Sequence, residues 1–136
     1  MDEIRAALDT LRQLSDAELD RLCRRHRVRV LTVFGSAVDA DVPAPADLDI
    51  GVVFEPDSDH DVLGLLDSLV AELGTERIDL LDVERASETA RYRAIAEGQP
   101  LYVSEPTAFA NAYAAAVMLY LDLAHLRRQA LAHPAP

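Results

Sequence analysis

Three short runs of β-branched and aliphatic residues limit the folds open to this chain more than any other feature of its sequence. They are Val28–Phe34 (VRVLTVF), Leu48–Phe54 (LDIGVVF) and residues 77–83 (RIDLLDV). Runs of this length and composition are typical of strands. A strongly apolar helical pattern at 62–73 lies between the second run and the third. The sequence therefore predicts an α/β fold, with a small mixed sheet flanked by helices.

Helix boundaries are marked by capping residues. Apolar residues at helical spacing predict a first helix near the N-terminus, and Ser15 with Glu18 forms the capping-box pattern that opens a second helix. Asp59 is the expected N-cap of the helix at 62–73, and Gly74 is its expected stop.

The rest of the pattern is a helix over 87–97, a short strand over 101–103 and a long alanine-rich helix at the C-terminal end. A chain of 136 residues suits one domain. We therefore expect a single domain over 1–136, with N-terminal helices at 1–27, an α/β core at 28–103 and a C-terminal helix at 106–132.

The charge of the chain excludes some partners. The formal net charge is -11 and there is no lysine, whereas nucleic-acid binders need basic residues to neutralise phosphates. We therefore expect no nucleic acid as a direct substrate. No apolar run approaches the roughly 20 residues that span a bilayer, and the polar, acidic N-terminus is unlike a secretory signal. No membrane partner and a cytoplasmic location are expected, while the oligomeric state is left open.

Two acids at the start of the second strand-like run are the first candidate site residues. Residues two apart in a strand point to the same face, so Asp47 and Asp49 are expected side by side while Leu48 and Ile50 face the core. Two neighbouring carboxylates recruit a cation or raise a pKa. Mg²⁺ fits best, because it binds through one or two carboxylates together with substrate phosphates.

Gly35 and Ser36 follow the first strand-like run directly. Glycine lets the backbone approach an anion closely, and the N–H groups after it can form a phosphate nest. The serine hydroxyl can donate to a phosphate oxygen. We therefore expect a nucleotide phosphate to bind at Gly35 and Ser36.

A third carboxylate is expected from the run at 77–83. Asp79 is enclosed by aliphatic residues, as Asp49 is, and an unpaired acid in mid-strand is costly without a function. Asp82 is the alternative, but it lies near the end of the run, where acids are commonly solvated. Asp47, Asp49 and Asp79 together can hold two Mg²⁺ ions, one at the attacking oxygen and one at the leaving group.

The motif Gly-Ser, ten residues, Asp-x-Asp and a later strand Asp resembles that of the DNA polymerase β-like nucleotidyltransferases, and the short chain resembles their minimal (MNT) branch, whose members pair with HEPN ribonuclease toxins. The resemblance runs from about residue 28 to the final helix. It implies a polymerase β-like fold and ATP-dependent adenylylation of a partner, in which Asp47 and Asp49 bind metal and Asp79 is the third carboxylate and base.

The acceptor implied by this resemblance is a tyrosine of a HEPN-type toxin, because we see no acceptor-binding domain and a protein partner brings its own surface. Two alternatives stay open: an antitoxin that neutralises its toxin by binding alone, and an enzyme that modifies a small-molecule hydroxyl. The sequence departs from the family pattern at residues 37–40 (AVDA), where an arginine is common, and at Ala46, where serine is common. The missing arginine favours the binding-only alternative, whereas the intact acids favour the enzyme.

Overall fold

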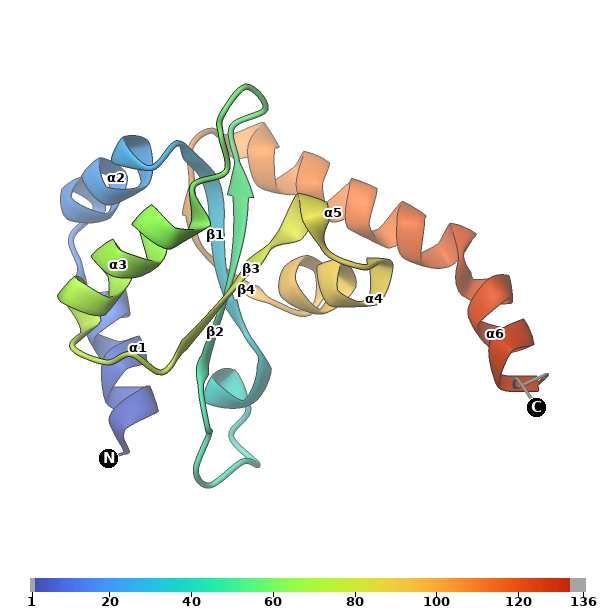
Figure 1. The fold of residues 1–136 in the computed structure, drawn as a ribbon, viewed down its shortest axis with the longest axis horizontal. Coiled ribbons are helices and arrows are strands. Elements are labelled where there is room, and N and C mark those ends of the chain that lie inside the picture. Colours follow the sequence, from blue (N-terminus) through green and yellow to red (C-terminus); the bar gives the residue numbers. More distant parts are fainter. Residues whose placement is uncertain (1, 133–136) are drawn as a thin grey trace.

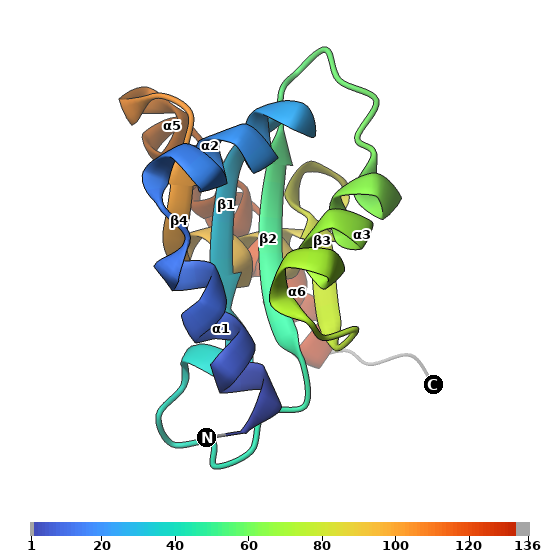
Figure 2. The same ribbon diagram turned by 90° about the vertical axis from the view of Figure 1, so that its left-hand side faces the viewer.

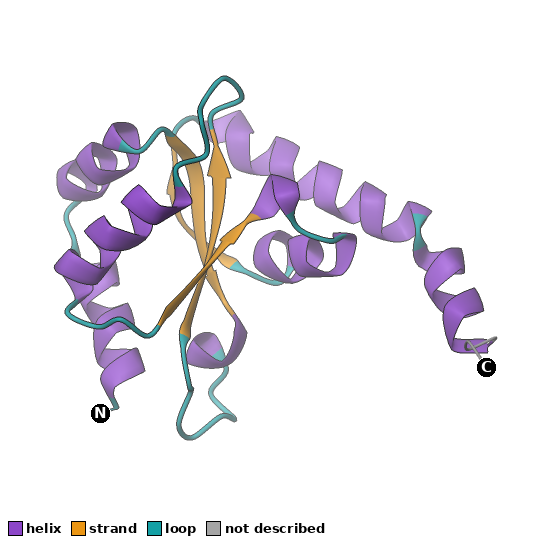
Figure 3. Ribbon diagram, in the orientation of Figure 1, coloured by secondary structure: helices purple, strands orange, loops and turns teal. Residues whose placement is uncertain are grey.

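The computed structural model describes residues 2–132; residue 1 and residues 133–136, the two ends of the expected domain, lie outside the described residues. One mixed sheet has the strand order β3-β2-β1-β4. Its strands are β1 (Val28–Phe34), β2 (Leu48–Phe54), β3 (Ile78–Asp82) and β4 (Gln99–Val103). β1 pairs antiparallel with β2 and β4, and β2 pairs parallel with β3. The α/β class with a small mixed sheet flanked by helices is confirmed (Figure 3).

One face of the sheet is covered by α1 (Glu3–Gln13), α2 (Asp16–Arg25) and α3 (Val62–Leu73), which lie in front of the strands in Figure 2. Leu48 and Ile50 of β2 point into this core and are fully buried, as expected from their positions between the two acids. The alternation of β2 therefore turns its odd-numbered residues toward the opposite face.

The helix caps are those predicted from the sequence, with one exception. Ser15 and Glu18 form the expected capping box, and Gly74 ends α3 with a left-handed φ of 69°. Asp61 rather than Asp59 is the N-cap of α3, because its side chain accepts a hydrogen bond from the backbone N–H of Gly64 at 3.0 Å. Acids at 57, 59 and 61 alternate in the sequence, so spacing alone does not identify the cap.

The other face is covered by α4 (Glu88–Arg91), the π-helical turn η3 (Tyr92–Ala96) and α5 (Pro106–Asp122), as Figure 1 shows. The sequence predicted one regular helix over 87–97. Instead, the backbone N–H of Glu97 donates to the carbonyl of Tyr92 at 3.1 Å, five residues back, as in a π-bulge.

A buried hydrogen bond fixes η3 on the sheet. The Thr32 hydroxyl of β1, which has no exposed surface, donates to the Ala94 carbonyl at 2.7 Å. The carbonyl of Ala94 is therefore turned toward the strand. Glycines line this contact: a Cβ on Gly51 would lie 2.6 Å from the Thr32 hydroxyl, and one on Gly98 would lie 2.0 Å from the Ala94 carbonyl. Small residues let η3 approach the sheet this closely.

The expected long C-terminal helix is present as α5, but it does not run unbroken to residue 132. α5 ends at Asp122 with Leu123 as its C-cap, and α6 (Ala124–Ala132) continues in another direction, away from the sheet (Figure 1). The stretch Pro106–Ala132 has 27 residues, and by length and composition it could cross a membrane, although only 11% of its most apolar window is buried. The sequence argument from apolar length therefore fails for this stretch. The absence of a membrane partner stays a prediction, because an apolar helix that packs on a protein meets the same test.

We expect Thr32→Val to destabilise the fold by about 1–3 kcal/mol, because valine keeps the shape but leaves the buried Ala94 carbonyl without its donor. Urea unfolding followed by circular dichroism measures this change. Thr10→Val is the matched control, because the Thr10 hydroxyl donates to the Ala6 carbonyl on an exposed helix surface where water can replace it. Equal losses in the two variants would contradict the role given to Thr32.

Candidate functional site

Asp49 and Asp79 lie opposite each other on neighbouring strands. The parallel pairing of β2 with β3 places Asp49 in register with Asp79. Leu48 and Ile50 point to the core of α1, α2 and α3, so the alternation of β2 turns Asp49 to the face that carries α4 and η3. The pairing brings two carboxylates from separate segments of the chain together at the end of the sheet where β2 and β3 begin.

Asp47 immediately precedes β2, and two arginines hold the loop that leads to it. Arg5 of α1 donates to the backbone carbonyls of Asp39 at 3.0 Å and Pro43 at 3.1 Å. Arg77 donates through Nε to the carbonyl of Ala46 at 2.8 Å. The exposed Asp47 side chain is therefore carried by a loop whose backbone is tied to the domain at both ends.

The environment of Asp49 disfavours its ionised form. Burial of the half-buried Asp49 carboxyl raises its pKa, and the neighbouring charges of Asp79 and Asp47 raise it further, while Arg93 lowers it. Burial and like charges both disfavour the ionised form of a carboxyl group. Asp49 is thus the carboxylate with most to gain from a bound cation.

Asp82, the alternative third acid, is engaged elsewhere. His60 Nδ1 lies 2.7 Å from Asp82 Oδ2, and Arg85 Nε lies 3.7 Å from the same oxygen. The side chain of Asp82 is 9% exposed. Asp79, by contrast, is exposed and in register with Asp49. The structure therefore places Asp79, and not Asp82, next to the two acids at the start of β2.

Gly35 packs against the carboxylate of Asp49. Its φ is 75°, in the left-handed region that favours glycine. A Cβ at this position would lie 2.2 Å from Asp49 Oδ2, a distance at which one of the two groups must move. The sequence assigned Gly35 to the approach of a phosphate, whereas the structure shows that the Asp49 side chain already occupies the space beside it.

Ser36 follows Gly35 in a short 3-10 helix, η1 (Gly35–Val38). Both residues line an open polar cavity of about 530 Å³, which is within the range of ligand sites. The whole lining is Gly35, Ser36, Val38, Asp39, Ala40, Val42, Arg93, Glu97 and Gln99. The expected phosphate site at Gly35 and Ser36 is therefore a wall of a real cavity beside Asp49.

Arg93 is the lining residue that sequence reasoning missed. Arg85, Arg91 and Arg93 all fall in the same stretch of sequence, and helical spacing does not separate them. The π turn of η3 decides which one lines the cavity, and a π turn has no sequence signal comparable to a cap. Arg91 instead donates to the backbone carbonyls of Ala86 and Glu84.

The chemistry of the acids fits a divalent cation. Carboxylate oxygens are the ligands that Mg²⁺ prefers, and the pKa of Asp49 is raised first by burial and then by the charges of Asp79 and Asp47. Within residues 2–132, no group of three or more His, Cys, Asp or Glu side chains is close enough to form a complete metal site as it stands. The acids are therefore neighbours whose side chains must converge further to share an ion.

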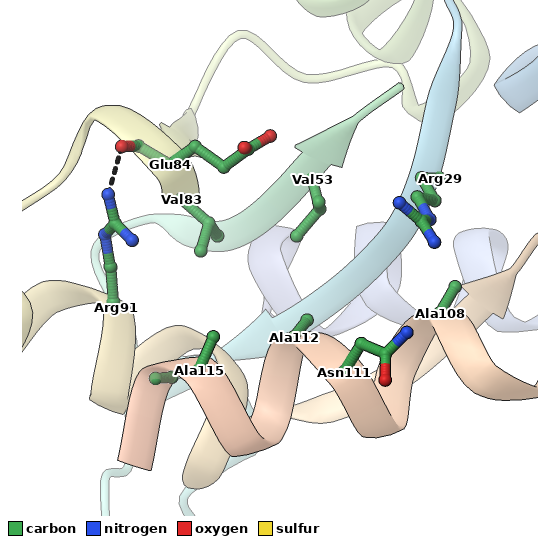
Figure 4. A pocket seen from close by; sticks show the side chains of 10 residues that line it. Arg29, Val53, Val83, Glu84, Arg91, Ala108, Asn111, Ala112 and Ala115 are labelled. Atoms are coloured by element: carbon green, nitrogen blue, oxygen red, sulfur yellow. Dashed lines mark hydrogen bonds between the residues drawn. The ribbon is translucent and has the colours of Figure 1, made fainter. Parts of the chain in front are cut away.

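A second cavity, of about 230 Å³, lies between the sheet and α5 and contains none of the predicted site residues (Figure 4). Val53, Val83 and alanines of α5 line it together with Arg29 and Arg91. Arg29 pairs with Glu105 at 3.2 Å. These arginines are engaged with protein groups, so we assign this cavity to packing rather than to the site.

We expect Gly35→Ala to cost more stability than Gly74→Ala. Both glycines have a left-handed φ, 75° and 69°, which costs an L-residue about 1–2 kcal/mol. Only at Gly35 does the new Cβ meet another group, since nothing lies within 4 Å of a Cβ on Gly74. Urea unfolding of both variants isolates the clash with Asp49. An equal decrease in the free energy of unfolding for both variants would show that the Asp49 carboxylate moves aside without cost.

We expect Asp49→Asn, a change of nearly equal shape, to raise the melting temperature of the metal-free protein at neutral pH. A carboxyl whose pKa is raised by folding binds its proton more tightly in the folded state, so its stabilising effect is lost as pH rises through the folded pKa. The advantage of the variant should therefore shrink on acidification. Melting curves in EDTA between about pH 4 and pH 8 test this, with the exposed Asp59→Asn as control; a difference that is independent of pH would contradict it.

The profile of the family described as "Polymerase beta, Nucleotidyltransferase" matches residues 17–107. No curated protein matches the chain.

Solved structures share the fold. A chain from the tri-AMPylated Shewanella oneidensis HEPN toxin in complex with MNT antitoxin is 21% identical, with a TM-score of 0.63, over 89% of this chain and 93% of that one. A chain from a toxin–antitoxin complex with AMP-PNP is 20% identical, with a TM-score of 0.65, over 88% and 94%. A chain from the MntA–HepT complex is 19% identical, with a TM-score of 0.60, over 85% and 90%. At these identities the likeness is one of fold.

Proposed function

This chain belongs to the polymerase beta nucleotidyltransferase family, and from that premise we propose that it is an adenylyltransferase antitoxin, which transfers AMP from ATP to a tyrosine hydroxyl of a HEPN-type ribonuclease toxin. The observation that carries the proposal is the placement of Asp49 in register with Asp79, directly beside Gly35 at the end of β1. Acids and a glycine-lined cavity thus meet at one edge of the sheet.

Each site residue has a role in this proposal. Asp47 and Asp49 would hold Mg²⁺, with Asp79 as the third carboxylate, and the ions would supply positive charge to the reacting phosphate group. Gly35 and Ser36 bind phosphate: the backbone at Gly35 borders the cavity, and the Ser36 hydroxyl donates to a phosphate oxygen. Asp79 accepts the proton of the attacking hydroxyl, because it is the exposed acid of the pair.

The reaction is an in-line displacement. The tyrosine oxygen forms a bond to the α-phosphorus of ATP, the bond between that phosphorus and the bridging oxygen breaks, and pyrophosphate leaves with the electron pair. The tyrosine proton passes to Asp79. Such a transfer requires positioning and electrostatic stabilisation more than covalent help from the protein, which agrees with a site made of acids, glycine and serine.

A protein acceptor is supported by the surface of α5 and α6. Beyond the region matched by the family profile, this part of the chain exposes large apolar side chains: Tyr113, Met118, Leu121, Leu126 and Leu131. Apolar patches of this kind mark interaction surfaces. The fold is also shared with chains from solved toxin–antitoxin structures, one of which contains an AMPylated HEPN toxin.

The second candidate is an antitoxin that binds its toxin without modifying it. The absence of arginine at residues 37–40 favours this alternative, and the apolar surface of α5 and α6 serves it equally well. Modification of a small-molecule hydroxyl is less well supported, because no observation on this surface favours a small acceptor.

Incubation with Mg²⁺, ATP and a HEPN-type toxin tests the proposal, and the product of the neighbouring reading frame is the first protein to examine as that toxin. We expect intact-mass spectrometry to find AMP-sized additions on the toxin. In Asp47→Asn/Asp49→Asn the transfer rate should fall at least roughly a hundred-fold, the scale of losing preorganised electrostatic stabilisation of the transition state. Asp59→Asn, an exposed acid in another loop, should transfer at the parent rate. A toxin that carries no AMP but is still neutralised by the double variant would establish the binding-only function.

A further inference from the structure

Arg93 is the one cationic residue among those that line the cavity at Gly35 and Ser36. Its side chain is exposed, and its guanidinium lies 5.9 Å from the centre of the Phe34 ring, at the end of β1. Across residues 2–132 its side chain has no ion pair and no hydrogen bond. Most other arginines of the chain are bound to acids or backbone carbonyls. The guanidinium of Arg93 is therefore free, within the described residues, to donate hydrogen bonds to a ligand in the cavity.

The backbone that carries Arg93 is fixed. The next two residues, Ala94 and Ile95, are fully buried, and the Ala94 carbonyl accepts the buried hydrogen bond from Thr32. The π turn therefore combines a rigid backbone with an exposed cation. π-bulges are frequent at functional sites, and a donor on a fixed backbone needs less ordering when it binds a ligand.

The negative charge around the cavity favours a cationic donor at this position. Asp39 and Glu97 line the cavity, and Asp49 lies directly against its wall residue Gly35, in a chain of net charge -11. The phosphates of ATP are negatively charged, so a cationic side chain in addition to Mg²⁺ favours the binding of ATP in this acidic surrounding. Arg93 lies near enough to the acids for its charge to lower the pKa of Asp49.

We infer that Arg93 is a nucleotide-binding residue, whose guanidinium binds the phosphate chain of the nucleotide in this cavity. The inference rests on the proposed function, since it presupposes a nucleotide at this site. An arginine fork suits phosphate oxygens, to which it can donate two parallel hydrogen bonds. The residue comes from η3, so the missing arginine at 37–40 does not leave the site without a cation.

Calorimetric titration with MgATP, and separately with adenosine, tests the inference without any acceptor. We expect Arg93→Ala to weaken MgATP binding roughly ten- to a hundred-fold, the range for a hydrogen-bonded charged group, and to leave adenosine binding unchanged. Arg93→Lys should fall between the parent and Arg93→Ala, because lysine keeps the charge but loses the fork. Arg24→Ala is the control: it removes the same charge from an exposed pair with Asp20 on α2, and should bind MgATP as the parent does.

Three results overturn the inference, and they are distinguishable. If the parent binds MgATP and Arg93→Ala binds it equally well, Arg93 does not contact phosphate, while the proposed function stands. If Arg93→Ala weakens the binding of adenosine and of MgATP equally, and also melts at a lower temperature, the role of Arg93 is structural. If the parent itself binds no MgATP, the proposed function fails together with the inference.

Discussion

The candidate site depends on the parallel pairing of β2 with β3. Parallel strands cannot be joined by a tight turn, so the chain must cross the sheet between them, and α3 makes this crossing with Leu65, Leu69 and Leu73 buried against the sheet. The register that results places Asp49 beside Asp79. Residues 30 positions apart in the sequence thus become neighbours because an apolar helix packs between the strands that carry them.

This arrangement concentrates like charge where the fold gains nothing from it. Asp49 is half-buried beside two other acids, and its pKa is raised. Position 35 is a glycine, because any side chain there would collide with the Asp49 carboxylate. A domain selected for stability alone would replace these groups with apolar residues. A half-buried acid beside two like charges, in an otherwise ordinary sheet, is typical of sites kept for binding or catalysis.

The sequence predicted what depends on local chemistry. The three main strands, the capping box at Ser15 and the burial of Leu48 and Ile50 all follow from residue patterns that tertiary contacts reinforce. It did not predict the π turn at η3 or the break at Leu123. The π turn depends on a hydrogen bond between Thr32 and Ala94, 62 positions apart, which no local pattern encodes. Arg93 was missed for the same reason, since its place in the cavity is set by that turn.

The exposed apolar surface of α5 and α6 has a consequence for the isolated protein in solution. Leu121 and Leu131 are 63% and 84% exposed, so two copies that meet through this arm would gain contact area. The net charge of -11 opposes such an approach, because like charges repel at long range. Salt shortens that repulsion to a Debye length of about 8 Å at physiological ionic strength, and acid near the pI of about 4.6 removes it. Repulsion between copies is therefore strongest at low ionic strength and neutral pH, and it weakens as salt is added or as the pH approaches the pI.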